Sequence, residues 1–72
     1  MTEAGRMKIV YQGREVETSA GTVAEFLAEK GVDAAKAIVE YASEVHAPGT
    51  DLSRLKLEEG AALDVFRLAA GG

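Results

Sequence analysis

A single strong helix signal in the middle of the chain limits what this sequence can fold into. Thr22 and Glu25 have the spacing of a capping box, in which the threonine hydroxyl accepts from the amide of Glu25 and the carboxylate reaches back. Gly31 stands where a left-handed residue would end the helix. Three apolar residues share one face of the segment between these signals: Val23, Phe26 and Leu27. We therefore predict one helix, over residues 22–30.

Residues that alternate between apolar and polar side chains surround this helix. Residues 7–11 and 14–18 show the two-residue period of strands with one buried face, and Gln12-Gly13 between them suits a hairpin turn. Residues 62–68 repeat the pattern near the end of the chain. The sequence thus predicts a hairpin before the helix and a last strand after it.

The segment over residues 34–42 is ambiguous at the level of propensity. Its apolar residues recur at helical spacing, whereas the adjacent β-branched Ile38 and Val39 favour a strand over residues 37–41. We also expect one short helical turn over residues 52–55.

These patterns predict an α+β fold, in which a mixed sheet of four or five strands wraps around the one helix. With 72 residues and no cysteine, the domain depends on apolar packing for its stability. Eight residues are predicted to form the core: Ile9, Val16, Val23, Phe26, Leu27, Val39, Leu63 and Val65.

The charge balance argues against several kinds of partner. The net charge is −4, from 12 Asp and Glu against 8 Lys and Arg, and no cationic cluster interrupts it, so nucleic-acid binding is not expected. An acidic protein suits a partner with a positively charged docking surface. No apolar run approaches the ~20 residues of a membrane span, and the first residues lack a secretory signal. We therefore expect a cytoplasmic protein that does not bind membranes.

The side chains offer little for a conventional active site. The chain has no cysteine, and the serines do not stand in a nucleophile-elbow pattern. The one histidine, His46, is interpreted as a surface strand residue, and no residue cluster has metal-ligand spacing. We expect no catalytic residues and no metal, and hence not an enzyme.

The terminal Gly71-Gly72 is the remaining chemical feature. A frayed chain end is one interpretation. Its place after a predicted strand, with only small residues beyond Leu68, supports another. So thin a tail fits a narrow channel of a partner enzyme, and glycine reaches backbone conformations that other residues do not. The unhindered carboxyl carbon of Gly72, once adenylated, would react readily with a sulfur or nitrogen nucleophile.

In this setting the chain resembles the β-grasp sulfur carriers, which are relatives of ubiquitin. Three segments are similar to the ThiS family of thiamine biosynthesis: Met7-Lys8-Ile9-Val10-Tyr11, Thr22-Val23-Ala24-Glu25-Phe26-Leu27 and Val65-Phe66-Arg67-Leu68-Ala69-Ala70-Gly71-Gly72. The resemblance covers roughly residues 6–72 and favours the strand over residues 37–41. It implies a ubiquitin-like, ThiS/MoaD-like β-grasp domain over residues 6–68. Residues 2–5 and 69–72 lack large apolar side chains, so we expect a disordered leader over residues 1–5 and a flexible diglycine tail over residues 69–72.

The resemblance also implies a mechanism and a set of partners. A ubiquitin-activating-type, ThiF-like adenylyltransferase would use ATP to adenylate the Gly72 carboxylate, so that the carrier itself needs no cofactor. Sulfur from a persulfide donor would then displace AMP and leave a C-terminal thiocarboxylate, which a ThiG-like thiazole synthase would accept. The free carrier is expected to be a monomer.

The last strand is expected to present the docking surface for that adenylyltransferase. If Leu63 and Val65 point into the core, alternation places Phe66 and Leu68 on the outer face. Exposed single aromatics are common, but aromatics are also enriched at interface anchors, and Phe66 lies close to the end of the chain. We predict that Phe66 and Leu68 dock and that Gly71 keeps the tail narrow.

Two departures from the family pattern leave the pathway open. Ala42-Ser43 stands where the family often has Asn-Gly, so a loop that is longer or differently shaped is expected there. The stretch over residues 46–55 is also longer than in close relatives. The alternatives are a sulfur carrier for molybdopterin or cysteine synthesis, and a ubiquitin-like modifier joined to lysine through Gly72. A β-grasp binding module with an inert diglycine is a third.

Overall fold

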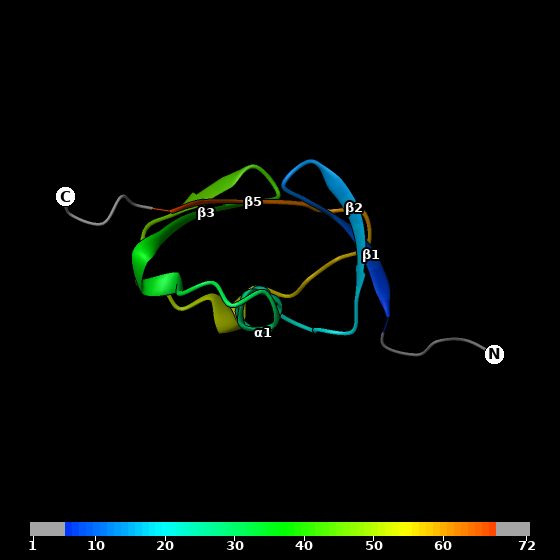
Figure 1. Ribbon diagram of the computed structural model, residues 1–72, viewed down its shortest axis with the longest axis horizontal. Helices are drawn as coiled ribbons and strands as arrows, with labels where there is room; N and C mark the ends of the chain where they lie inside the picture. Colours follow the sequence, from blue (N-terminus) through cyan, green and yellow to red (C-terminus); the bar gives the residue numbers. More distant parts are fainter. Residues whose placement is uncertain (1–5, 68–72) are drawn as a thin grey trace.

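The computed structural model describes residues 6–67, in which a five-stranded sheet curves over one α-helix (Figure 1). The strands are β1 (Met7–Tyr11), β2 (Arg14–Thr18), β3 (Ala37–Tyr41), β4 (Glu44–His46) and β5 (Ala62–Arg67). They lie in the order β2-β1-β5-β3-β4 across the sheet. Because β1 and β5 are parallel and the other neighbours are antiparallel, the sheet is mixed, as predicted.

Helix α1 (Val23–Glu29) lies against the inner face of the sheet, and its caps are those that the sequence predicts. The Thr22 hydroxyl accepts from the Glu25 amide at 3.1 Å. The Glu25 carboxylate reaches back to the amide of Gly21, at 2.7 Å, one residue earlier than in a regular capping box. Gly31 follows with a φ of +71° and ends the helix.

Two short 3-10 helices connect the remaining elements. η1 (Ala34–Lys36) leads directly into β3, so the ambiguous segment forms one helical turn and then the predicted strand. η2 (Leu52–Arg54) lies in the long connection between β4 and β5, where one short helical turn is expected from the sequence.

The first hairpin has the tight turn that Gln12-Gly13 predicts. Tyr11 pairs with Arg14, which leaves only these two residues in the turn. Their φ angles are +53° and +82°, so both adopt the left-handed conformation that a type I′ turn requires.

The second hairpin corrects the expectation of a longer loop. Tyr41 pairs with Glu44, so Ala42 and Ser43 form a turn of the same length, with φ angles of +52° and +73°. The physical reason lies outside the turn, because the Ala42 amide donates to the carbonyl of Ala62 in β5 at 3.0 Å. This tertiary hydrogen bond favours a tight turn that the local residues disfavour.

The Tyr41 side chain fixes the second hairpin to the loop before β5. Its hydroxyl donates to the carbonyl of Lys56 at 2.8 Å and accepts from the amide of Glu58 at 2.9 Å. Burial raises the pKa of Tyr41 above its ordinary value, and the nearby carboxylate of Glu58 also raises it. The neutral hydroxyl is therefore the form that the folded protein favours.

The core lies between the sheet and α1 and contains most of the predicted residues. The largest fully buried side chains are Phe26, Ile9, Leu27, Leu63, Val23 and Val39, and Val65 is also buried. The Phe26 ring packs edge-to-face on Tyr11, with 4.9 Å between the ring centroids. The prediction that Val16 is a core residue is corrected: it packs against the core but is only partly buried, because β2 is an edge strand.

Further buried residues lie at the two ends of β3 and in the connections between the elements. These are Ala20, Val32, Ala37, Tyr41, Leu52 and Leu57. Most of them lie in or beside the connections, which close the core at its edges and supply apolar area that α1 alone does not provide.

The architecture is a small α+β, β-grasp-like fold, as predicted. The disordered leader predicted over residues 1–5 and the flexible tail predicted over residues 69–72 lie outside the described residues. Among the helices of residues 6–67, none is long and apolar enough to cross a membrane.

Candidate functional site

Strand β5 leads toward the diglycine, and its register decides which side chains face outward there. Val65 pairs with Val39 of β3, and both are buried, so these positions face α1. Phe66 therefore lies on the opposite face, where it is 53% exposed. The predicted outward orientation of Phe66 is confirmed, whereas its docking role stays a prediction.

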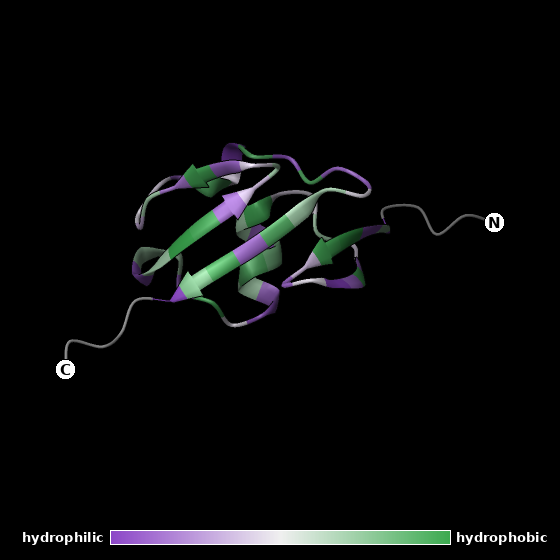
Figure 2. Ribbon diagram, turned by 90° about the horizontal axis from the view of Figure 1, so that it is seen from above, coloured by the Kyte–Doolittle hydropathy of each residue, from purple (hydrophilic) through white to green (hydrophobic). Residues whose placement is uncertain are grey.

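The outer face of the sheet, which is the face turned away from α1 and toward the viewer in Figure 2, holds an apolar group around Phe66. Ile38 of β3 lies directly opposite Phe66 and is half-buried. Val45 of β4 is 68% exposed and pairs with Glu40, so it lies on the same face. We call Ile38, Val45 and Phe66 the outer apolar group.

Two carboxylates lie beside this group. Glu40 of β3 and Asp64 of β5 are directly opposite each other on the outer face. Like charges in this position destabilise a strand pair, so their placement gives no structural advantage. Together with the outer apolar group they form a surface complementary to a partner that is apolar and positively charged.

The last part of β5 extends beyond its parallel neighbour. β1 pairs with β5 only as far as Tyr11 and Leu63, so residues 64–67 have β3 as their neighbour on one side and no β1 residue on the other. The Gln12 side chain occupies the start of that open edge. Its amide nitrogen donates to the carbonyl of Val65 at 3.2 Å, and its oxygen accepts from the Val65 amide at 2.9 Å.

These two hydrogen bonds make the Gln12 side chain act as one more strand residue. They satisfy both backbone groups of Val65 where the β1 backbone has turned away into the hairpin. The strand that presents Phe66 is thereby held in place almost to its end. The sequence pattern places Gln12 in the hairpin turn but does not indicate its contact with Val65.

Three of the four predicted site residues lie outside the described part of the chain. These are Leu68, Gly71 and Gly72. Phe66 is the described member, and the strand that presents it continues to Arg67, five positions before the terminal residue. The predicted roles of the other three stay predictions.

His46 lies in a strand as predicted, but its side chain is more buried than that of a surface residue. Only 16% of its side chain is exposed, because its position pairs with the core-facing Val39. Its Nε2 has no hydrogen-bond partner among the described residues and lies 3.9 Å from a carboxylate oxygen of Glu44. No nucleophile is therefore positioned at this imidazole by the contacts of residues 6–67.

Among the serines, Ser53 has a structural partner. The Ser53 hydroxyl donates to Asp51 at the start of η2, and this hydrogen bond holds the pKa of the Asp51 carboxyl below its ordinary value. Across residues 6–67, no group of three or more His, Cys, Asp or Glu is arranged to hold a metal ion.

Two comparisons with known proteins returned no match. No protein-family model matches the chain, and no curated protein matches it. The case for a function therefore depends on the fold, the outer face and the sequence of the tail.

Proposed function

We propose that this chain is a sulfur carrier of the ThiS type, whose C-terminal Gly72 is converted to a thiocarboxylate. The observation that supports it most is the position of β5. The strand that leads to the diglycine is central in the sheet, runs past its parallel neighbour, and exposes Phe66 on the outer face near its end. A rigid strand of this kind is suited to presenting a thin tail to a partner enzyme.

The proposed chemistry needs no reactive side chain on the carrier. An adenylyltransferase joins the Gly72 carboxylate to the α-phosphate of ATP, and pyrophosphate leaves. The terminal sulfur of a persulfide donor attacks the acyl carbon, and the bond to AMP breaks. A thiol then reduces the sulfur–sulfur bond of the acyl disulfide and frees the thiocarboxylate. A thiazole synthase is the proposed acceptor, and the cytoplasm is the proposed location of these steps.

The outer face is the proposed docking surface for the adenylyltransferase. Phe66 is exposed, neighbours Ile38 in the outer apolar group, and lies beside the carboxylates of Glu40 and Asp64. Aromatic anchors within a ring of polar groups are typical of interface hot spots. Phe66→Ala should raise the KM for adenylation by about tenfold, as the loss of a hot spot of ~1.4 kcal/mol would. Phe66→Tyr, which keeps the ring, should change the KM by less than about twofold.

The test of the function is the mass of the intact protein after the reaction. The wild type, Gly71→Val and a Gly72 deletion are incubated with adenylyltransferase, ATP and a sulfur donor. The wild type should gain the mass of one oxygen-to-sulfur exchange, and the two variants should not. The deletion places the carboxylate one residue short of the nucleotide, and attack needs the reacting atoms ~3–3.5 Å apart.

The outcomes separate this function from its alternatives. A thiocarboxylate on the deletion variant, or none on the wild type, would reject the sulfur-carrier function. Covalent adducts with cellular proteins that require Gly72 would instead indicate a ubiquitin-like modifier. All three proteins should share one melting temperature, so that a loss of reaction is not a loss of fold.

A further inference from the structure

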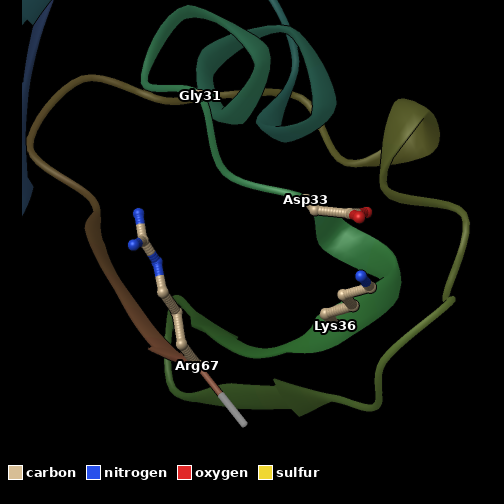
Figure 3. Close-up of a pocket in the computed structure, with 4 residues that line it drawn as sticks. All are labelled: Gly31, Asp33, Lys36 and Arg67. Carbon is tan, nitrogen blue, oxygen red and sulfur yellow. The ribbon is translucent and has the colours of Figure 1, made fainter. Parts of the chain in front are cut away.

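A cavity of about 220 Å³ lies on the inner side of the sheet, where β5 ends (Figure 3). It is lined by Gly31, which follows α1, by Asp33 and Lys36 around η1, and by Arg67 at the end of β5. The outer apolar group is on the other face of the sheet, so this cavity is separate from the proposed docking surface.

The register of β5 places an arginine where a core residue would be expected. Arg67 pairs with Ala37, which is buried on the inner face, so its side chain is directed to the same side as Val65 and Leu63. α1 ends at Glu29 and does not cover Arg67, and the segment that begins at Gly31 leads away to η1. The guanidinium therefore points into an open cavity and remains exposed, as Figure 3 shows.

The cavity wall is positive in a protein that is negative overall. Lys36 and Arg67 come from different elements on opposite sides of the cavity, and Asp33 is the one acidic residue among the lining residues. The lining thus sums to +1, from two cations and one carboxylate, whereas the whole chain has a net charge of −4.

The existing carboxylate forms no ion pair with these cations. Asp33 Oδ1 accepts from the amide of Ala35 at 3.0 Å and so caps η1. Within residues 6–67, neither Lys36 nor Arg67 takes part in an ion pair. Two cations around an open cavity are a site for an anion that fits between them.

We propose that this cavity binds a carboxylate side chain of the partner that handles the tail. Its volume is below the ~300–1,000 Å³ of typical small-molecule sites, which suits one acidic side chain better than a nucleotide. Arg67 is also five residues from Gly72, so a partner that holds the terminus lies within reach of the cavity. The identity of that partner rests on the proposed function, whereas the anion site itself is tested without adenylation.

The proposal predicts that the partner contacts this protein at two places of opposite charge, the outer face and the cavity. The outer face offers carboxylates and apolar side chains to a positive surface, and the cavity offers two cations to a negative group. A partner that satisfies both surfaces must have basic and acidic groups at set positions on either side of the tail. Such an arrangement selects this carrier over one that lacks the cavity.

The test uses the ¹⁵N-labelled full chain, titrated with a capped tetraglutamate peptide at constant ionic strength and observed by amide NMR spectra. Saturable shifts should appear at Gly31, Asp33 and Lys36, and a capped tetraglutamine peptide should not produce them. Lys36→Gln and Arg67→Gln should each weaken binding by about fivefold, the effect of one partly exposed ion pair. Lys8→Gln is the matched control, since Lys8 is an exposed cation of β1, and it should weaken binding by less than about twofold.

Three results would overturn the proposal. One is equal weakening by Lys8→Gln, which would indicate general attraction without a site. Another is the same shifts with tetraglutamine. The third is a response of these amides to inorganic phosphate at matched ionic strength but not to tetraglutamate, which would make the ligand a phosphate. The thiocarboxylate assay does not enter any of these outcomes, so failure of the anion site and failure of the sulfur-carrier function are distinguishable.

Discussion

The hairpin of β1 and β2 and the hairpin of β3 and β4 reverse direction over two residues with positive φ, but they do so with different residues. Gln12-Gly13 places a glycine at the second position, whereas Ala42-Ser43 places two residues with a Cβ in the left-handed region. That conformation costs roughly 1–2 kcal/mol for each such residue. The second hairpin therefore bears a conformational cost that the first partly avoids.

Both turns make the same contact with β5, from opposite sides. The backbone amide of Gln12 donates to the carbonyl of Leu63 at 3.0 Å, and the backbone amide of Ala42 donates to the carbonyl of Ala62 at 3.0 Å. Both turns are therefore positioned to hold the start of β5. A tight turn is kept in the second hairpin because a longer loop would move the Ala42 amide away from its acceptor.

The largest expected effect is the fall in the free energy of unfolding when the Gln12 side chain is removed. Gln12→Ala removes both side-chain hydrogen bonds to Val65 and leaves two partly buried backbone groups without partners. We expect the free energy of unfolding to fall by about 2 kcal/mol, measured by urea denaturation. Gln12→Glu keeps an acceptor for the Val65 amide and should lose about half as much. A change below ~0.5 kcal/mol for Gln12→Ala would show that water replaces the side chain without cost.

The corresponding anchor of the second hairpin is Tyr41. Tyr41→Phe keeps the ring but removes the hydroxyl that joins Lys56 and Glu58, and should lower the free energy of unfolding by about 1.5 kcal/mol at pH 7.

The raised pKa of Tyr41 also predicts that stability depends on pH. The folded state holds the phenol proton more tightly than the unfolded state, so its stabilising contribution is complete below pH ~10 and is lost as the pH rises through the folded-state pKa. Urea titrations from pH 9 to 11 should show a steeper loss of stability for wild type than for Tyr41→Phe; parallel curves would contradict the assignment.

The turn residues themselves should have opposite effects in the two hairpins. Replacing Ala42-Ser43 by Asn-Gly relieves the left-handed strain and should raise the free energy of unfolding by about 1 kcal/mol. Gly13→Ser in the first hairpin introduces the same strain and should lower it by about 1 kcal/mol. Thermal unfolding of the two variants beside wild type measures both. Equal effects of the same sign would mean that the turns do not limit stability.

The smallest expected effect is at Val45, on the edge strand of the second hairpin. Val45→Thr keeps the β-branched shape and should change the free energy of unfolding by less than about 0.5 kcal/mol, because the side chain is already 68% exposed. Its adenylation KM, measured beside that of Phe66→Ala, shows whether the docking surface extends to β4. A large loss of stability would contradict the picture of a solvent-exposed edge.

The elements that local patterns specify were predictable from the sequence. The helix has its cap, apolar face and terminal glycine within a few residues, and β1, β2 and β5 show regular alternation. The turn at Ala42 was not predictable in the same way, because its conformation is favoured by a hydrogen bond to Ala62, twenty positions away. Propensity describes what a residue prefers alone, and here a tertiary contact overrides it.

The same distinction between local patterns and tertiary contacts applies to the candidate site. The outward direction of Phe66 follows from alternation in one strand and was predicted. The Gln12 contact to Val65 and the cavity between Lys36 and Arg67 require segments from distant parts of the chain to meet, which a periodicity does not reveal. The buried Leu52 and Leu57 were missed for a similar reason, because no repeating pattern surrounds them.

The parallel pairing of the first and last strands has a consequence for how the protein is made. β5 lies between β1 and β3, so the sheet is divided into two separate hairpins until residues 62–67 are available. Such non-local closure slows folding relative to a helical protein of the same size. It also means that a nascent chain still on the ribosome, with β5 not yet emerged, has no complete sheet. An interrupted translation product would then lack the outer face around Phe66, which is the proposed docking surface.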